Sequence, residues 1–207
     1  MARAPTAPTA LEPASGRAAV SMEDLLRRIV LALEQAGVPY MLTGSLASSY
    51  YGEGRGSQDI DIVIAPDEAG LRRFVASLPA TTYYVDEETA LDAFRRRAQF
   101  NVIDMHSGFK VDLILRRERD FSRAEFERRL SVDAMGMRLN IATAEDIIIA
   151  KLEWAKAGAS ERQLEDVAGI LRDPESPLDM SYLERWVRDL GVSTQWARAR
   201  ELAREKP

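Results

Sequence analysis

The chain contains no cysteine and a single histidine among its 207 residues. The absence of thiols excludes a disulfide framework and a thiolate zinc site, and it points to a reducing compartment. His106 alone cannot build a multi-histidine metal centre and is predicted to be a turn residue, in the tight turn HSG of a hairpin whose strands are AQFNVIDM and FKVDLIL. No apolar run approaches the roughly 20 residues of a membrane span, and the N-terminus lacks the apolar block of a secretory signal. The chain is therefore predicted to be cytoplasmic, with no membrane partner.

Basic side chains are also in deficit, since 28 Lys and Arg against 33 Asp and Glu leave a formal net charge of -5. Proteins that coat nucleic acid are usually basic, so only a local basic face is compatible with this charge. Arginine-rich segments at 95–97 and 115–123 are interpreted as solvated faces, with contact to an RNA backbone as the alternative. Trp154, Trp186 and Trp196 fall on predicted helices and are expected to pack them together.

Periodicity and composition divide the chain into three parts. Residues 1–20 are largely Ala, Pro and Thr and bury too little apolar surface to fold, so they are predicted to be a disordered tail. Residues 21–142 open with a Ser-x-x-Asp capping box at Ser21 and Asp24 and mix helical and strand periodicity, which indicates an α/β (α+β) unit with a mixed β-sheet flanked by helices. Residues 143–207 are helical throughout and are predicted to form a small C-terminal helical domain. Three of its helices open with Thr/Ser-x-x-Asp/Gln/Glu capping signals, at Thr143, Ser160 and Ser181.

The segment TGSLASSYYGEGRGSQDIDIVI, at 43–64, carries the strongest chemical signal. In the strand DIDIVI the side chains alternate, so the isoleucines share one face while Asp59 and Asp61 share the other. Two carboxylates on one face lose hydration and repel each other unless a cation lies close to both. Mg²⁺ suits such a place, because it binds one or two carboxylates together with substrate phosphates. The pattern therefore indicates a site for a metal–nucleotide complex.

Two further features complete the predicted site. The Gly44-Ser45 turn before a short helix lets the backbone approach an anion, and it directs the first amides of the helix at phosphate. In the strand FKVDLIL, Asp112 interrupts an apolar run and has Lys110 and Ile114 on its face. If this strand pairs with DIDIVI, three carboxylates converge, as in two-metal phosphoryl transfer.

These residues resemble a known signature. Gly44-Ser45, thirteen intervening residues, Asp59-Ile-Asp61 and a later lone Asp112 are similar to the motif of the polymerase-beta-like nucleotidyltransferase superfamily, with Gly-Ser in place of the commoner Gly-Gly. The segments GRGSQDIDIVI, QFNVIDMHSGFKVDLIL, ATAEDIIIAKLEWAKAG and SERQLEDVAGILRD resemble AbiEii-type nucleotidyltransferases, a family that includes toxins of toxin–antitoxin pairs. The resemblance covers roughly residues 21–205.

The resemblance implies a nucleotidyltransferase fold and a reaction in which Mg²⁺ or Mn²⁺ assists transfer of an NMP from an NTP to a hydroxyl. The implied acceptor is an RNA or tRNA end or a protein, and an antitoxin is the implied further partner. Asp112 would complete the second metal site and help to deprotonate the acceptor. The residues so implied are Asp59, Asp61 and Asp112 as catalytic metal ligands, and Gly44, Ser45, Arg55, Ser57 and Lys151 as substrate-binding residues.

Other interpretations of the same residues stay open. The acids could be solvated on an edge strand, and Lys151 could snorkel out of the apolar run DIIIAKLEW. Asp166 also matches the family and could pair with Arg162 one helical turn earlier. At the level of function, the alternatives are transfer to a small molecule such as an antibiotic, and a catalytically silent nucleotide-binding module. Three converging acids argue against a silent site.

Overall fold

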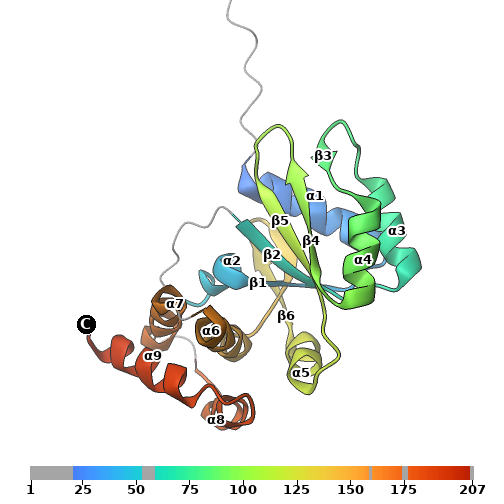
Figure 1. Ribbon diagram of the computed structural model, residues 1–207. Coiled ribbons are helices and arrows are strands. Elements are labelled where there is room, and N and C mark those ends of the chain that lie inside the picture. Colours follow the sequence, from blue (N-terminus) through green and yellow to red (C-terminus); the bar gives the residue numbers. More distant parts are fainter. Residues whose placement is uncertain (1–20, 53–58, 159, 174–176, 206–207) are drawn as a thin grey trace, which may run out of the picture.

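The computed structural model describes residues 21–52, 59–158, 160–173 and 177–205. The predicted tail at 1–20 and the predicted substrate-binding residues Arg55 and Ser57 lie outside the described residues. Within them the chain forms one mixed β-sheet with helices on both faces, and further helices follow the last strand (Figure 1). The predicted α/β architecture with a helical C-terminal part is confirmed.

The described strands form a sheet in the order β3-β4-β5-β2-β1-β7-β6. Their bounds are β1 (Tyr40–Thr43), β2 (Asp59–Ile64), β3 (Tyr83–Tyr84), β4 (Gln99–Asp104), β5 (Lys110–Leu115), β6 (Leu130–Ala134) and β7 (Met137–Ile141). Strand β2 runs parallel to β5, and β1 runs parallel to β7, whereas the other neighbours are antiparallel. The hairpin predicted around the sequence HSG is the β4–β5 pair and is confirmed.

Helices cover the two faces of the sheet differently. Their bounds are α1 (Met22–Gln35), α2 (Gly44–Ser48), α3 (Glu68–Ser77), α4 (Glu87–Arg96), α5 (Asp120–Arg128), α6 (Ala144–Gly158), α7 (Glu161–Arg172), α8 (Met180–Asp189) and α9 (Ser193–Glu205). Helices α1, α3 and α4 lie together on one side, and α6 lies with α7, α8 and α9 on the other (Figure 1). None of the helices in the described ranges combines the length and apolarity that a bilayer crossing needs.

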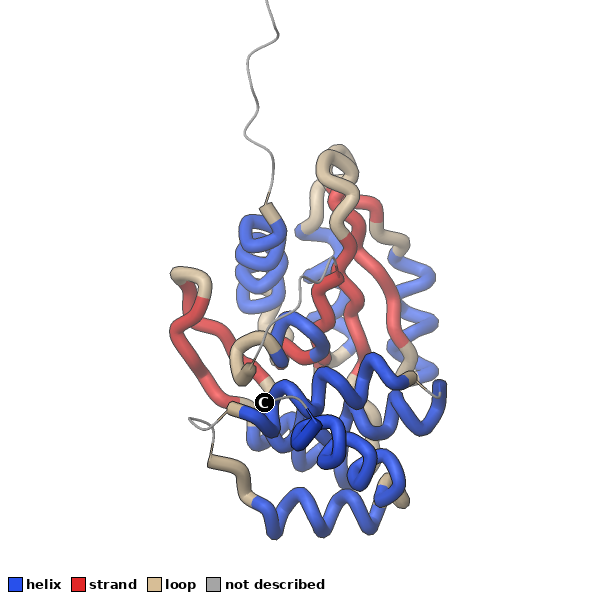
Figure 2. Tube along the Cα trace, turned by 90° about the vertical axis from the view of Figure 1, so that its left-hand side faces the viewer, coloured by secondary structure: helices blue, strands red, loops and turns tan. Residues whose placement is uncertain are grey.

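The β6–β7 hairpin extends away from the C-terminal helices and reaches α1 (Figure 2). Its turn is held there by Arg27 of α1, which donates to the carbonyl oxygens of Met135 at 3.1 Å and Gly136 at 3.3 Å. One edge of the sheet is thereby tied to the first helix.

Local signals account for some helix starts better than for others. The predicted capping box at α1 is confirmed, because Ser21 accepts from the amide of Asp24 and the Asp24 carboxylate accepts from the amide of Ser21. Thr143 likewise caps α6. Helix α7 has no side-chain cap bond, and α8 is capped by Asp179 instead of the predicted Ser181. An aspartate two residues upstream is an equally good cap, so the chain starts this helix earlier.

The register of β2 is fixed by its apolar face. Ile60, Ile62 and Ile64 are fully buried in the core, whereas Asp59 is exposed and Asp61 is half-buried on the opposite face. Each buried isoleucine contributes roughly 1.5–3 kcal/mol. A slip of one residue would put the two acids into the core and the isoleucines outside. The hydrophobic pattern therefore determines where the acids point.

Candidate active site

Asp61 and Asp112 are brought together by the parallel pairing of β2 with β5. The register places Asp61 directly opposite Asp112, and it places Thr43 of β1 opposite Asp61 on the other side. Cross-strand partners lie on the same face of a sheet. The predicted pairing of the two acidic strands is therefore confirmed.

Gly44 lies where β1 turns into α2. Its φ is +67°, a conformation that side chains other than hydrogen disfavour. A Cβ at this position would lie 2.9 Å from Cβ of Asp61 and 2.7 Å from Cγ of Asp61, well inside van der Waals contact. Glycine is thus what allows the turn to pack directly against the Asp61 carboxyl group.

The first amides of α2 lie next to these acids. Thr43 precedes the helix and makes no side-chain cap hydrogen bond, so no cap competes for the amides that open the helix. Because α2 spans only Gly44–Ser48, its dipole is small. Any attraction for phosphate at this turn comes mainly from the N–H groups themselves.

A cavity of about 270 Å³ adjoins these groups. Its lining includes the predicted site residues Gly44, Ser45, Asp61, Asp112 and Lys151. Gln99 of β4 and Gln163 of α7 also line it, and neither was predicted from the sequence. Gln99 is recognisable only once β4 is paired with β5, because its strand position then places it on the acidic face.

Asp59 lies apart from this cavity. It is absent from the lining residues, and its side chain is 56% exposed. The register pairs Asp59 with Lys110 and not with an acid. The three predicted carboxylates therefore share one face, but only Asp61 and Asp112 face each other across the strands.

The two opposed acids create an electrostatic cost. Burial, followed by the negative charges of Asp112 and Asp59, raises the pKa of Asp61 to about 6. Oδ1 of Asp112 is buried and has no hydrogen-bond partner among the described residues. A buried carboxylate oxygen without a partner is unfavourable unless another group binds it.

Lys110, for which the sequence predicted no role, is the compensating cation of this acidic face. Its ammonium nitrogen lies 3.0 Å from Oδ2 of Asp112 and 3.7 Å from Oδ1 of Asp59. The hydrogen bond to Asp112 raises the pKa of Lys110. The signal was present, because residues two apart on a strand share a face.

The residues fit a divalent cation that completes its shell with substrate. Within the described ranges no three His, Cys, Asp or Glu side chains form a ready-made metal cluster. The opposed Asp61 and Asp112, with the unpartnered Oδ1 of Asp112, instead offer two carboxylates. That donor set suits Mg²⁺ or Mn²⁺ bound together with nucleotide phosphates.

Lys151 points into the protein and does not snorkel. It is 4% exposed, and its Nζ donates to Oδ2 of Asp166 at 2.9 Å and to Oε1 of Gln163 at 3.2 Å. Its charge also lowers the pKa of Asp61, against the larger opposing effect of burial. The sequence suggested Arg162 as a partner for Asp166. In the structure Asp166 pairs with Lys151 and holds that ammonium group beside the cavity.

Asp104, another acid of the β4–β5 hairpin, lies on the opposite face of the sheet. It is fully buried, and Oδ2 accepts from Arg28 of α1 at 2.8 Å. Burial opposes its ionisation, yet the amides of Ser107 and His106 and the charge of Arg28 hold the pKa of Asp104 below its usual value. Asp104 closes the hairpin turn and is not part of this cavity.

Comparison with known proteins identifies the fold. Neither a scan against known protein families nor a search of curated proteins found a match. Among solved structures, an antigenic nucleotidyltransferase-like protein from Paracoccidioides brasiliensis is similar, with a TM-score of 0.51 and 17% identity over 89% of this chain and 94% of that chain. The chain has a nucleotidyltransferase-like fold.

Two weaker similarities extend over comparable lengths. JHP933 from Helicobacter pylori has a TM-score of 0.40 and 18% identity, covering 90% of this chain and 94% of its own. ANT(2")-Ia, solved with adenylyl-2"-tobramycin, has a TM-score of 0.42 and 12% identity, covering 89% of this chain and 98% of that chain. The assignment of the nucleotidyltransferase-like fold rests on the Paracoccidioides brasiliensis protein, and the AbiEii-type resemblance stays a prediction.

Proposed function

We propose that this protein is a metal-dependent nucleotidyltransferase that moves an NMP from an NTP to a hydroxyl acceptor. The observation that supports this most strongly is the opposed pair Asp61 and Asp112, packed against Gly44 in a cavity that Lys151 also lines. Paired carboxylates can bind a cation, and open amides with an ammonium group can bind a polyphosphate. A nucleoside triphosphate with its metal satisfies both sets of groups.

In this proposal the triphosphate binds at the turn between β1 and α2. The amides of Gly44 and Ser45 donate to phosphate oxygens, and the small glycine allows the close approach. Lys151 reaches the phosphates or the base, held in place by its ion pair with Asp166. Asp61 and Asp112 would hold Mg²⁺ or Mn²⁺, which would supply positive charge to offset charge on the triphosphate.

Asp112 acts on the acceptor in this mechanism. The acceptor hydroxyl oxygen attacks the α-phosphorus, the bond from that phosphorus to the bridging oxygen breaks, and pyrophosphate leaves. The hydroxyl proton passes to the Asp112 carboxylate. The contribution of the protein is to hold the two reactants in line and to stabilise the developing charge.

The acceptor follows from the family resemblance. The proposed acceptor is an RNA or tRNA end or a protein hydroxyl, in a toxin–antitoxin pair. Transfer to a small molecule is the same chemistry with another acceptor, and it would proceed in the absence of RNA and protein substrates. Asp59 would assist the metal from the rim of the site, where it is exposed beside Lys110.

Incubation with labelled nucleotides tests the proposed reaction. Each NTP, labelled at the α-phosphate or at the γ-phosphate, is incubated with the protein, Mg²⁺ and total cellular RNA. We expect α-label to appear on an acceptor and γ-label to be released in pyrophosphate. Transfer of γ-label would indicate phosphoryl transfer instead, and no turnover of any NTP with any acceptor fraction would indicate a silent module.

A further inference from the structure

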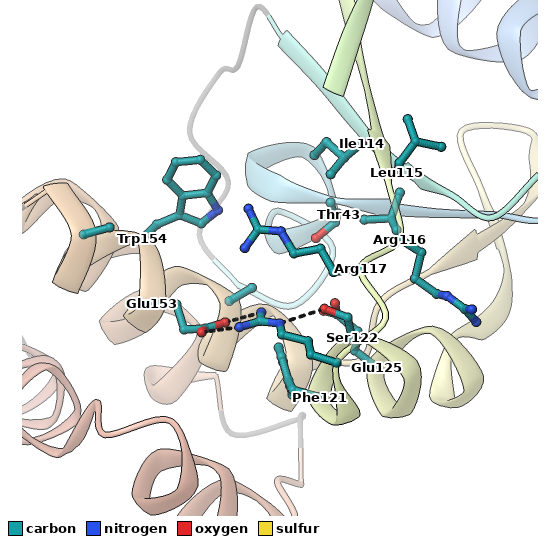
Figure 3. Close-up of a pocket in the computed structure, with 14 residues that line it drawn as sticks. Thr43, Ile114, Leu115, Arg116, Arg117, Phe121, Ser122, Glu125, Glu153 and Trp154 are labelled. Carbon is teal, nitrogen blue, oxygen red and sulfur yellow. Dashed lines mark hydrogen bonds and ion pairs between the residues drawn. The ribbon is translucent and has the colours of Figure 1, made fainter. Parts of the chain in front are cut away.

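A second cavity of about 270 Å³ adjoins the candidate active site (Figure 3). The two cavities share Thr43, Ile114, Ala150 and Trp154 as lining residues. The second cavity extends from there over the end of β5 towards α5 and the last turns of α6. A molecule in this cavity would therefore lie directly beside Asp112 and the proposed triphosphate.

The carboxylates of this second cavity carry no unbalanced negative charge. Glu153 accepts two hydrogen bonds of 2.6 Å from Arg119, so these two charges neutralise each other (Figure 3). Burial, followed by the charge of Asp146, raises the pKa of Glu125 to about 8, which leaves this carboxyl group largely neutral at pH 7. A cationic ligand would find no free anion here.

Arg117 supplies the unbalanced charge of the cavity. It lies two residues beyond β5, is exposed, and makes no hydrogen bond or ion pair with any part of the chain that the structure describes. In Figure 3 its side chain extends from β5 towards the side on which Trp154 lies. The neighbouring Arg116 is instead held by Glu118 at 3.1 Å. The cavity therefore favours an anion at Arg117.

Trp154 gives the same cavity a flat apolar wall. It was expected to pack helices, as Trp186 and Trp196 do, but its side chain is 62% exposed. An indole left in solvent beside an unpaired guanidinium offers stacking for a ring and a charged hydrogen-bond donor for a phosphate. These are the two contacts that single-stranded nucleic acid makes with its binding proteins.

We infer that this second cavity is the acceptor subsite and takes a nucleotide unit, with its base against Trp154 and its phosphate on Arg117. The inference rests on the proposed function and specifies its acceptor. A free mononucleotide and the 3′ end of an RNA strand share this chemistry. The unbalanced positive charge disfavours a polycationic antibiotic as acceptor.

Binding measurements on the full chain test this assignment. The probe is a fluorescent RNA tetranucleotide with a free 3′ hydroxyl, titrated into the wild type, Arg117→Gln, Trp154→Ala and the control Arg95→Gln. Arg95 is an exposed arginine of α4, outside the lining of both cavities, so the control removes the same charge elsewhere. We expect the first two variants to weaken RNA binding about tenfold or more and the control to leave it unchanged.

Competition distinguishes the sources of the ligand. Displacement of the probe by free AMP or CMP at comparable concentration would identify a mononucleotide acceptor, and resistance to them would identify an RNA end. Equal RNA affinity in all four proteins, no RNA binding, or preferential binding of an aminoglycoside or a serine-containing peptide would overturn the inference. Calorimetry of metal and NTP on the wild type, without RNA, reports on the proposed function separately.

Discussion

The ammonium group of Lys110 lies 3.0 Å from the carboxylate of Asp112, two positions away on β5, and 3.7 Å from that of Asp59 on the neighbouring strand β2. The protein thus carries an internal cation beside the acids proposed to bind metal. Such a group stabilises the acidic face without a ligand, because it offsets repulsion among carboxylates. It also competes with any metal ion for Asp112.

Replacing Lys110 with Met should therefore strengthen metal binding in the absence of nucleotide. We expect Mn²⁺ affinity to rise severalfold, since the ion no longer displaces an ammonium group, and the free energy of unfolding of the metal-free protein to fall. Titration followed by electron paramagnetic resonance measures the first effect. Lys156→Met is the control, because Lys156 binds the carbonyl oxygens of Leu190 and Gly191. Unchanged or weaker Mn²⁺ binding in Lys110→Met would contradict this role.

Gly44→Ala and Gly108→Ala form a matched pair that isolates the contact with Asp61. Both glycines have positive φ, +67° and +75°, so each substitution costs roughly 1 kcal/mol in backbone strain. A Cβ at Gly108 meets nothing within 4 Å, whereas one at Gly44 collides with Asp61. We expect only Gly44→Ala to lose NTP binding, measured by calorimetry at equal folded fraction. Similar loss in both variants would show that strain and not the contact is responsible.

Asp112→Asn should separate catalysis from nucleotide binding. Because Asp112 takes the acceptor proton in the proposed mechanism while Asp61 still binds the metal, its loss should lower turnover by at least roughly 100-fold and, at saturating Mg²⁺, change the apparent KM for NTP much less. Asp133→Asn, at an exposed carboxylate of β6, is the matched control. Near-normal turnover of Asp112→Asn at saturating NTP and Mg²⁺ would remove Asp112 from the mechanism. Asp104 would not replace it, since it lies on the other face.

Glu125 should make stability depend on pH. Its folded-state pKa of about 8 lies above the ordinary 4.5, so folding favours the protonated form. The free energy of unfolding should therefore fall as pH rises from about 4.5 to 8, by at most about 5 kcal/mol from this group. Asp146, whose pKa burial also raises, acts in the same direction.

Glu125→Gln isolates the contribution of Glu125, because the amide keeps the shape and cannot ionise. Urea unfolding at pH 5 and pH 9 should show the variant gaining stability relative to the wild type only at the higher pH. Parallel pH profiles for the two proteins would mean that Glu125 is ionised throughout or exposed in the folded state.

Local patterns predicted the part of the site that lies within single strands. Alternation in DIDIVI placed Asp61 opposite the apolar face, and the HSG turn predicted the β4–β5 hairpin, because both depend on residues close in sequence. The pairings of Lys151 with Asp166 and Lys110 with Asp59 join different elements, so no local pattern contains them. The exposure of Trp154 likewise depends on how α6 packs, which periodicity alone does not determine.

Metal binding measured with and without nucleotide is the sharpest test of the proposed metal–nucleotide site, because it requires no knowledge of the acceptor. Mg²⁺ or Mn²⁺ is titrated calorimetrically into the protein alone and into the protein with a non-hydrolysable analogue of each NTP. The proposed site predicts weak binding alone, tight binding with at least one nucleotide, and loss of the tight binding in a folded Asp59→Asn, Asp61→Asn double variant. Absence of any nucleotide-dependent metal binding in the wild type would contradict the proposed metal–nucleotide site.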